Sequence, residues 1–161
     1  MIRSGRFGDI PRLTELFREM HARSKYATRA TLDEKHVKSL IVQALQRHGA
    51  THDGGTWVKV AEVNDVVEGF IIGVLDRVYH IGVELMATDL FFYCSPRSDV
   101  KAAGELLDSL VGWAKENPKV VEVCCAMTDA IGDWERTMLL YRRHGFKTTG
   151  GMAEISFERT R

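Results

Sequence analysis

Apolar residues recur at two different periods along the chain, and each period predicts one kind of element. Spacings of three and four predict helices, whereas alternation predicts strands. The first half predicts a strand, two helices and a β-hairpin, at residues 2–5, 9–24, 31–48 and 57–80. Within the hairpin, Asn64 and Asp65 suit the tight turn between its strands.

The second half alternates strands with helices. The pattern predicts a strand at 84–94, a helix that ends before Asn117, a strand at 120–127, a helix at 131–144 and a strand at 150–157. Strand 84–94 is most apolar at its C-terminal end and is expected to be central in the sheet. The β-α-β unit made by strands 84–94 and 120–127 needs its two strands parallel, with a right-handed crossover.

Polar and glycine residues mark the helix ends. Asp9, with Pro11 following, can cap the first helix, and Thr31 with Glu34 forms a capping box for the second. The last helix ends in "RRHG", where cations meet the negative end of the helix dipole and Gly145 supplies a left-handed cap.

These elements predict one domain of fold class α/β (α+β), spanning residues 1–161. Its sheet is mixed, mostly antiparallel, and flanked by helices on both faces. The order strand-helix-helix-strand-strand-strand-helix-strand-helix-strand defines a fold class, which alone does not give a function.

Composition excludes several function classes. The 22 Lys and Arg residues balance 22 Asp and Glu residues, so net charge gives no hint of a nucleic acid or membrane partner. No apolar run approaches a membrane span, and the N-terminus lacks a signal-peptide stretch. The three cysteines form no metal-binding motif, which favours a reduced, cytoplasmic protein without a metal.

The strand ending "FFYCSP", the helix "LLDSLVGWAKE", the strand "VVEVCCAM" and "LLYRRHGF" together resemble the GNAT superfamily of acyl-CoA-dependent N-acetyltransferases. The resemblance extends from residue 2 to the last strand, and its specific part is residues 85–146. It implies a GNAT-like fold, acetyl-CoA as cosubstrate, and an unidentified amine acceptor on a small molecule or protein. It leaves a homodimer open.

The resemblance also implies where acetyl-CoA lies. Backbone groups of Phe92, Tyr93 and Cys94 would pair with the pantetheine arm like an added strand. The pyrophosphate would lie over the loop and helix start, at Asp99, Val100, Lys101, Ala102, Ala103 and Gly104. The loop "RSDVKAAGE" has fewer glycines than the family pattern and is one residue shorter, so it can also be read as a helix start capped by Asp99. Cys94 is expected to be a small buried hydrophobe rather than a nucleophile.

For catalysis, the resemblance implies that Tyr141 protonates the departing CoA thiolate; the alternative is a packing role. The usual position of the general base is occupied by Thr88, which cannot act as one. Asp89 would point to the opposite face of a regular strand. The base therefore stays open among Glu68, Glu84, Asp89, His80 and water.

A second departure is Trp134, which stands where the family commonly has asparagine. The irregular loop and this substitution support an alternative function. In that alternative, the chain is a GNAT-like module with weak or no activity that acts in binding or structural interactions.

Overall fold

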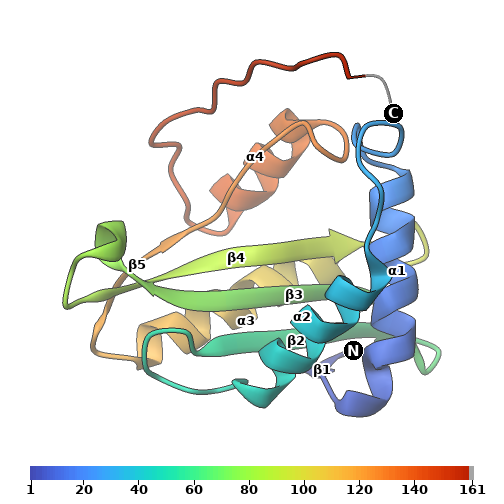
Figure 1. Cartoon of the computed structure of the whole chain (residues 1–161). Helices are drawn as coiled ribbons and strands as arrows, with labels where there is room; N and C mark the ends of the chain where they lie inside the picture. The colour runs from blue at the N-terminus through green and yellow to red at the C-terminus, as the bar shows by residue number, and fades with distance from the viewer. Residues whose placement is uncertain (160–161) are drawn as a thin grey trace.

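A computed structural model describes residues 1–159 of the chain (Figure 1). Its centre is a five-stranded sheet in the order β1-β2-β3-β4-β5. The strands are β1 Ile2–Ser4, β2 Thr56–Val63, β3 Val66–Arg77, β4 Leu85–Cys94 and β5 Val120–Cys124. All neighbouring strands are antiparallel except β4 and β5, which are parallel. The mixed, mostly antiparallel sheet is therefore confirmed.

Helices cover both faces of the sheet, as predicted. They are α1 Ile10–Ala22, α2 Glu34–Gln46, α3 Ala102–Glu116 and α4 Trp134–Arg143, with short 3-10 turns at Phe7–Asp9 and Val78–His80. One buried cluster joins α1 and α2 to one sheet face around Phe70, and another joins α3 to the opposite face around Leu110. No helix among residues 1–159 is long and apolar enough to cross a membrane.

The hairpin turn has the expected geometry. Asn64 and Asp65 have φ values of 50° and 62°, which suit the left-handed turns that join twisted strands. The α4 terminus is also as expected. Gly145 has φ of 88°, and the amide of Phe146 donates to the carbonyl of Tyr141, as in a Schellman cap.

The predicted caps of the first two helices are wrong. The Asp9 side chain makes no capping hydrogen bond to α1, because its oxygens accept from Arg3 at 2.7 and 2.8 Å and from the amide of Arg6 at 2.8 Å, at the turn before the helix. At α2, Asp33 rather than Thr31 is the capping residue, and its Oδ1 accepts from the amide of His36 at 2.9 Å. The helix therefore begins at Glu34, three residues later than the pattern indicated.

Strand β4 is irregular at its middle. Ile72 of β3 pairs with Phe91, and the next residue, Gly73, pairs with Asp89, so Leu90 is an extra residue without a partner on β3. Such a β-bulge reverses the inward and outward alternation of side chains beyond it. Beyond Thr88, β4 also separates from β5, because Thr88–Cys124 is the last pair that joins them.

The strand predicted at residues 150–157 is not formed. Residues 147–159 have no regular secondary structure, because a strand needs a partner and this segment runs over the top of the molecule instead of along β5 (Figure 1). Lys25 holds it there through Glu154 at 2.7 Å and also binds Asp129 at 2.6 Å.

Candidate active site

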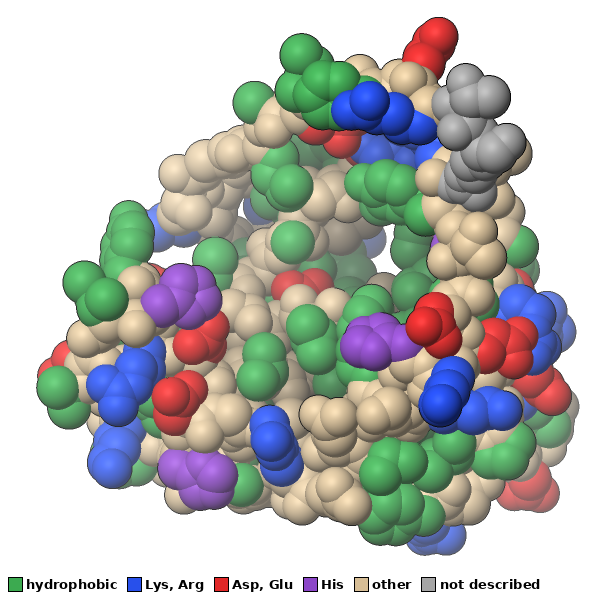
Figure 2. Space-filling model, viewed as in Figure 1, with side chains coloured by type: hydrophobic (Ala, Val, Ile, Leu, Met, Phe, Trp, Pro, Cys, Tyr) green, Lys and Arg blue, Asp and Glu red, His purple; other side chains and the backbone are tan. Residues whose placement is uncertain are grey.

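A large cleft lies between β4, the helices α1 and α2, and α4. Its volume is about 1010 Å³, and the space-filling view is hollowed between the sheet and the overlying C-terminal segment (Figure 2). Residues of β4 from Asp89 to Cys94 line it, together with Tyr141 of α4. The cleft therefore opens at the place where β4 separates from β5.

Asp89, Ala126 and Tyr141 meet at one side of this cleft. Asp89 Oδ1 accepts a hydrogen bond from the amide of Ala126 at 3.0 Å, where the β4–β5 ladder has ended. The Tyr141 hydroxyl lies 3.3 Å from Asp89 Oδ2 and 3.3 Å from the Ala126 carbonyl oxygen, and can donate to either. The strand separation thus leaves an acidic side chain and a phenol in contact beside open space.

Burial raises the pKa values of both Asp89 and Tyr141. It raises the pKa of Asp89 above its ordinary 3.8, although the amide of Ala126 and the Tyr141 hydroxyl oppose the rise. Burial, and then the negative charge of Asp89, raise the pKa of Tyr141 well above 10. Tyr141 therefore keeps its proton at neutral pH and acts as a donor, whereas Asp89 is a stronger base than an exposed aspartate.

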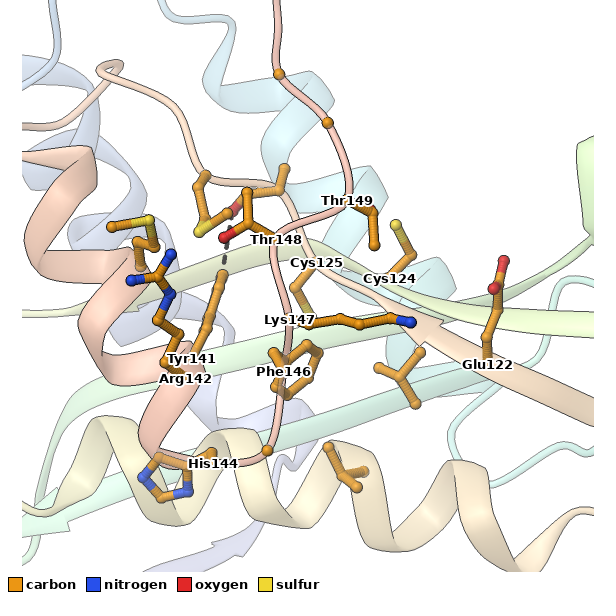
Figure 3. Close-up of a pocket in the computed structure, with 18 of the residues that line it drawn as sticks. Glu122, Cys124, Cys125, Tyr141, Arg142, His144, Phe146, Lys147, Thr148 and Thr149 are labelled. Atoms are coloured by element: carbon orange, nitrogen blue, oxygen red, sulfur yellow. Dashed lines mark hydrogen bonds between the residues drawn. The ribbon is translucent and has the colours of Figure 1, made fainter.

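A second cavity of about 570 Å³ lies on the other side of Tyr141. It is bounded by β5, α4 and the start of the C-terminal segment, and Figure 3 shows Tyr141 and Phe146 along one side with Cys124 and Cys125 beyond. The Tyr141 and Phe146 ring centroids are 5.3 Å apart. Tyr141 is only 3% exposed, so its ring packs while its hydroxyl stays available at the Asp89 side.

Five of the nine residues predicted to bind acetyl-CoA line the large cleft. They are Phe92, Tyr93, Cys94, Val100 and Ala103. Burial raises the pKa of the Cys94 thiol to about 11, so this thiol stays protonated and is a poor nucleophile. This agrees with the expectation that Cys94 is a small buried hydrophobe.

The rest of the predicted pyrophosphate loop is arranged differently. The Asp99 carboxylate accepts from the amide of Lys101 at 2.8 Å, so a negative charge already lies at the helix start. Ala102 packs in the core beneath α3. A side chain at Gly104 would collide with His144, whose Nε2 lies 2.6 Å from the place of a Cβ, so this glycine lets α4 approach α3.

The candidate general bases differ in their burial and in their hydrogen bonds. Glu68 is 6% exposed and accepts from Arg12, Ser95 and Arg97, each within 3.0 Å. Three donors on one carboxylate indicate a structural role. The predicted base candidates Glu84 and His80 are exposed and do not line the cleft.

Asp89 lines the cleft and contacts Tyr141, whereas Thr88 does not line the cleft. The two neighbours pair in regular register with Gly73 and Val74, and the bulge comes after them, at Leu90. The structure therefore brings Asp89, and not the position expected for the base at Thr88, to Tyr141. Trp134 begins α4 and is 43% exposed.

Sequence reasoning also missed the arginines of the cleft. Arg136 and Arg143 are seven residues, or about two helical turns, apart on α4. A helical wheel would have placed them on the same face of the helix. Arg23 has no such signal, because it follows the end of α1 and reaches the cleft only through the packing of α1 against the sheet.

No family model and no curated protein matches the sequence. Solved structures match over nearly the whole chain. One is a predicted acetyltransferase from Clostridium acetobutylicum, solved with acetyl-CoA, with 18% identity, 97% of this chain and 95% of that chain covered, and a TM-score of 0.69. A second is an aminoglycoside antibiotic 6'-N-acetyltransferase from Acinetobacter haemolyticus, with 15% identity, 99% of each chain covered and a TM-score of 0.68.

A third match is a ribosomal-protein-alanine N-acetyltransferase from Brucella melitensis biovar Abortus, with 16% identity, 98% of each chain covered and a TM-score of 0.68. At these identities the likeness establishes the fold and leaves the substrate open. The chain has the fold of the GNAT acetyltransferases.

Proposed function

We propose that this protein transfers an acetyl group from acetyl-CoA to a primary amine by direct attack. One observation carries the proposal: Tyr141 and Asp89 contact each other at the edge of the large cleft, where β4 separates from β5. The reaction needs a proton acceptor for the amine and a proton donor for the thiolate, and this pair offers one of each.

In the proposed reaction the neutral amine attacks the thioester carbonyl, forming the C–N bond of a tetrahedral intermediate. Asp89 accepts the proton that the nitrogen loses. The C–S bond then breaks, and Tyr141 donates a hydrogen bond and then its proton to the departing thiolate. The proton on Asp89 returns to the Tyr141 oxygen across their contact, which restores both groups. The products are the amide and free CoA.

The cosubstrate is proposed to lie along the part of β4 that has no partner on β5. Backbone groups of residues 91–94 are free of β5 there, and an extended pantetheine arm can pair with such an edge. Arg136 and Arg143 line the cleft from α4 and can face its phosphates. The Asp99 carboxylate opposes a phosphate at the α3 start, and this favours the second candidate, a binding module without transferase activity.

The decisive experiment combines binding and turnover. Acetyl-CoA at 100 times its Kd should stabilise the fold by about 2.7 kcal/mol, visible as a higher melting temperature. Thiol release should then be followed with a panel of primary amines. Stabilisation together with amine-dependent thiol release supports the transferase. Stabilisation without release for any amine, or no stabilisation at all, supports the module. The second of these outcomes also contradicts an acetyl-CoA site.

A further inference from the structure

The charged residues that line the large cleft are mostly cationic. Among the described residues, its lining contains the arginines Arg23, Arg136 and Arg143 but only two carboxylates, Asp89 and Asp133. Asp133 is engaged as the α4 cap, since its Oδ1 accepts from the amide of Glu135 at 2.9 Å. Asp89 belongs to the reacting pair. The arginines thus outnumber the carboxylates in the lining, which favours an acceptor with an anionic group over one with a second positive charge.

Arg23 is placed differently from the other two arginines. It enters from the end of α1, on the wall that faces α4. Its Nη1 donates to the Tyr93 hydroxyl at 3.1 Å, and that hydroxyl donates in turn to Glu19 at 3.0 Å. Glu19 is already paired with Arg97 at 2.7 Å. In the described part of the chain no carboxylate forms a direct ion pair with Arg23. The charge of Arg23 nevertheless acts on the nearby Glu19 carboxylate and helps to lower its pKa, so Arg23 shares Glu19 with Arg97 and keeps donors for a further anion.

The wall between Arg23 and the reacting pair is apolar. The side chains that line it from α1, the connection before α2, α2 and β4 are Phe17, Met20, Leu32, Val37, Leu40 and Phe91. Tyr93, which contacts Arg23, and Asp89 are four residues apart on β4, which separates their backbones by at most about 13 Å. An acceptor that reaches both groups therefore needs an extended chain of that order of length.

We propose that the acceptor is a primary amine on an apolar body with one anionic group at its far end, bound by Arg23. This inference rests on the proposed function. The amine would lie at Asp89, the apolar chain along the α1–α2 wall, and the anion, a carboxylate or similar group, against the guanidinium that Tyr93 positions. Polycationic acceptors are excluded by the same charges, because their second ammonium would meet Arg23.

Three probes of equal length test this inference: 8-aminooctanoate, octylamine and 1,8-diaminooctane. They differ only at the far end, which is anionic, neutral or cationic. We expect kcat/KM to be about tenfold higher for the aminocarboxylate than for octylamine, and lowest for the diamine. Arg23→Gln should abolish the preference, so that the ratio of kcat/KM for 8-aminooctanoate to kcat/KM for octylamine falls to about one. Arg29→Gln is the matched control, because Arg29 lies in the same connection but does not line the cleft.

The outcomes distinguish a failure of this inference from a failure of the proposed function on which it rests. If no amine is acetylated, the proposed function fails. If octylamine is acetylated as fast as 8-aminooctanoate, the proposed acetyltransferase function is supported and the anion-binding subsite at Arg23 is overturned. Binding of acetyl-CoA to Arg23→Gln completes the test: a weaker Kd with unchanged acceptor preference would assign Arg23 to the cosubstrate and also overturn the inference.

Discussion

The Tyr141 hydroxyl lies 3.3 Å from the Asp89 carboxylate, although the two residues are 52 positions apart in the sequence. Asp89 comes from the strand that separates from β5, and Tyr141 comes from the helix that follows β5. The contact joins a proton acceptor to a proton donor. In the proposed reaction, the proton that Asp89 takes from the amine can therefore replace the proton that Tyr141 gives to the thiolate.

Replacing Tyr141 with phenylalanine removes the donated proton and keeps the ring that packs against Phe146. We expect the rate of acetyl transfer to fall about 10²-fold, the usual contribution of a positioned acid. A single-turnover measurement with saturating enzyme avoids masking by slow product release. As a control, acetyl-CoA should raise the melting temperature of the Tyr141→Phe variant as much as that of the parent, which shows that the binding site is intact. Transfer at the parent's rate would reduce Tyr141 to a packing residue.

Asp89→Asn keeps the acceptor oxygen for the amide of Ala126 and removes the base. Because burial raises the pKa of Asp89, the parent's kcat/KM should fall with decreasing pH at a pH above the ordinary aspartate range. The asparagine variant should lose at least about 10²-fold in kcat/KM and show no such acid limb. A variant that retains the acid limb would mean that another group accepts the amine proton.

The same substitution should stabilise the fold at neutral pH. A carboxyl whose pKa is raised on folding binds protons better in the native state, so stability falls as pH rises through the native pKa. Asp89→Asn removes the cost of the buried charge, and its midpoint of urea unfolding should exceed the parent's at neutral pH. The difference should shrink as pH falls through the native pKa of Asp89 and the parent carboxyl protonates. A lower midpoint at neutral pH would show that Asp89 stabilises the site.

Asp99→Asn tests the anion site at the α3 start. Asparagine can still accept from the amide of Lys101, but it no longer repels phosphate. One unit charge at about 4 Å in water is worth about 1 kcal/mol, so acetyl-CoA should bind about fivefold more tightly at low salt. Calorimetric titration measures the change. An unaltered Kd would place the pyrophosphate away from this turn.

Glu68→Gln should destabilise the fold by about 2 kcal/mol at neutral pH, because Arg12 and Arg97 lose their shared carboxylate. Burial raises the pKa of Glu68, but the hydrogen bonds from Arg97 and Ser95 and the charge of Arg12 bring it below its ordinary 4.5. This stabilisation is therefore present above that value and is lost as pH falls through the native pKa.

The parent and Glu68→Gln should differ less in their free energy of unfolding at acidic pH than at neutral pH. Denaturant unfolding at both pH values measures this difference. Glu15→Gln is the control, because its exposed pair with Arg12 should contribute well under about 1 kcal/mol. Equal losses in the two variants would contradict a special role for the buried carboxylate.

The sequence predicts the regular elements of this fold well because their signals are local. The helical stripe that contains Val37, Ile41 and Leu45 is buried as expected, and so is the alternating face of the hairpin. The wrong cap at α2 involves two residue types that both cap helices, Thr31 and Asp33, so composition alone cannot choose between them. The missing last strand has a different cause: β-pairing depends on a distant partner, which a local pattern does not specify.

The site was predictable in part. Tyr141 could be selected from the "LLYRRHGF" pattern, and the structure places its hydroxyl at the cleft. Its partner could not be selected, because the bulge at Leu90 leaves no mark in the local alternation of β4. The ion pairs of Arg97 with Glu19 and Glu68, and the contact of Arg23 with Tyr93, all join residues more than 25 positions apart.

The extra residue Leu90 makes the active site depend on chain length as well as on residue identity. Deleting it would leave every functional side chain in the sequence but restore strict alternation along β4. Asp89 and the segment 91–94 could then no longer both keep their present faces, so either the base or the pantetheine edge would be turned away from the cleft. Homologous sequences in which this strand is one residue shorter should therefore be expected to lack the acid–base pair, however similar they are elsewhere.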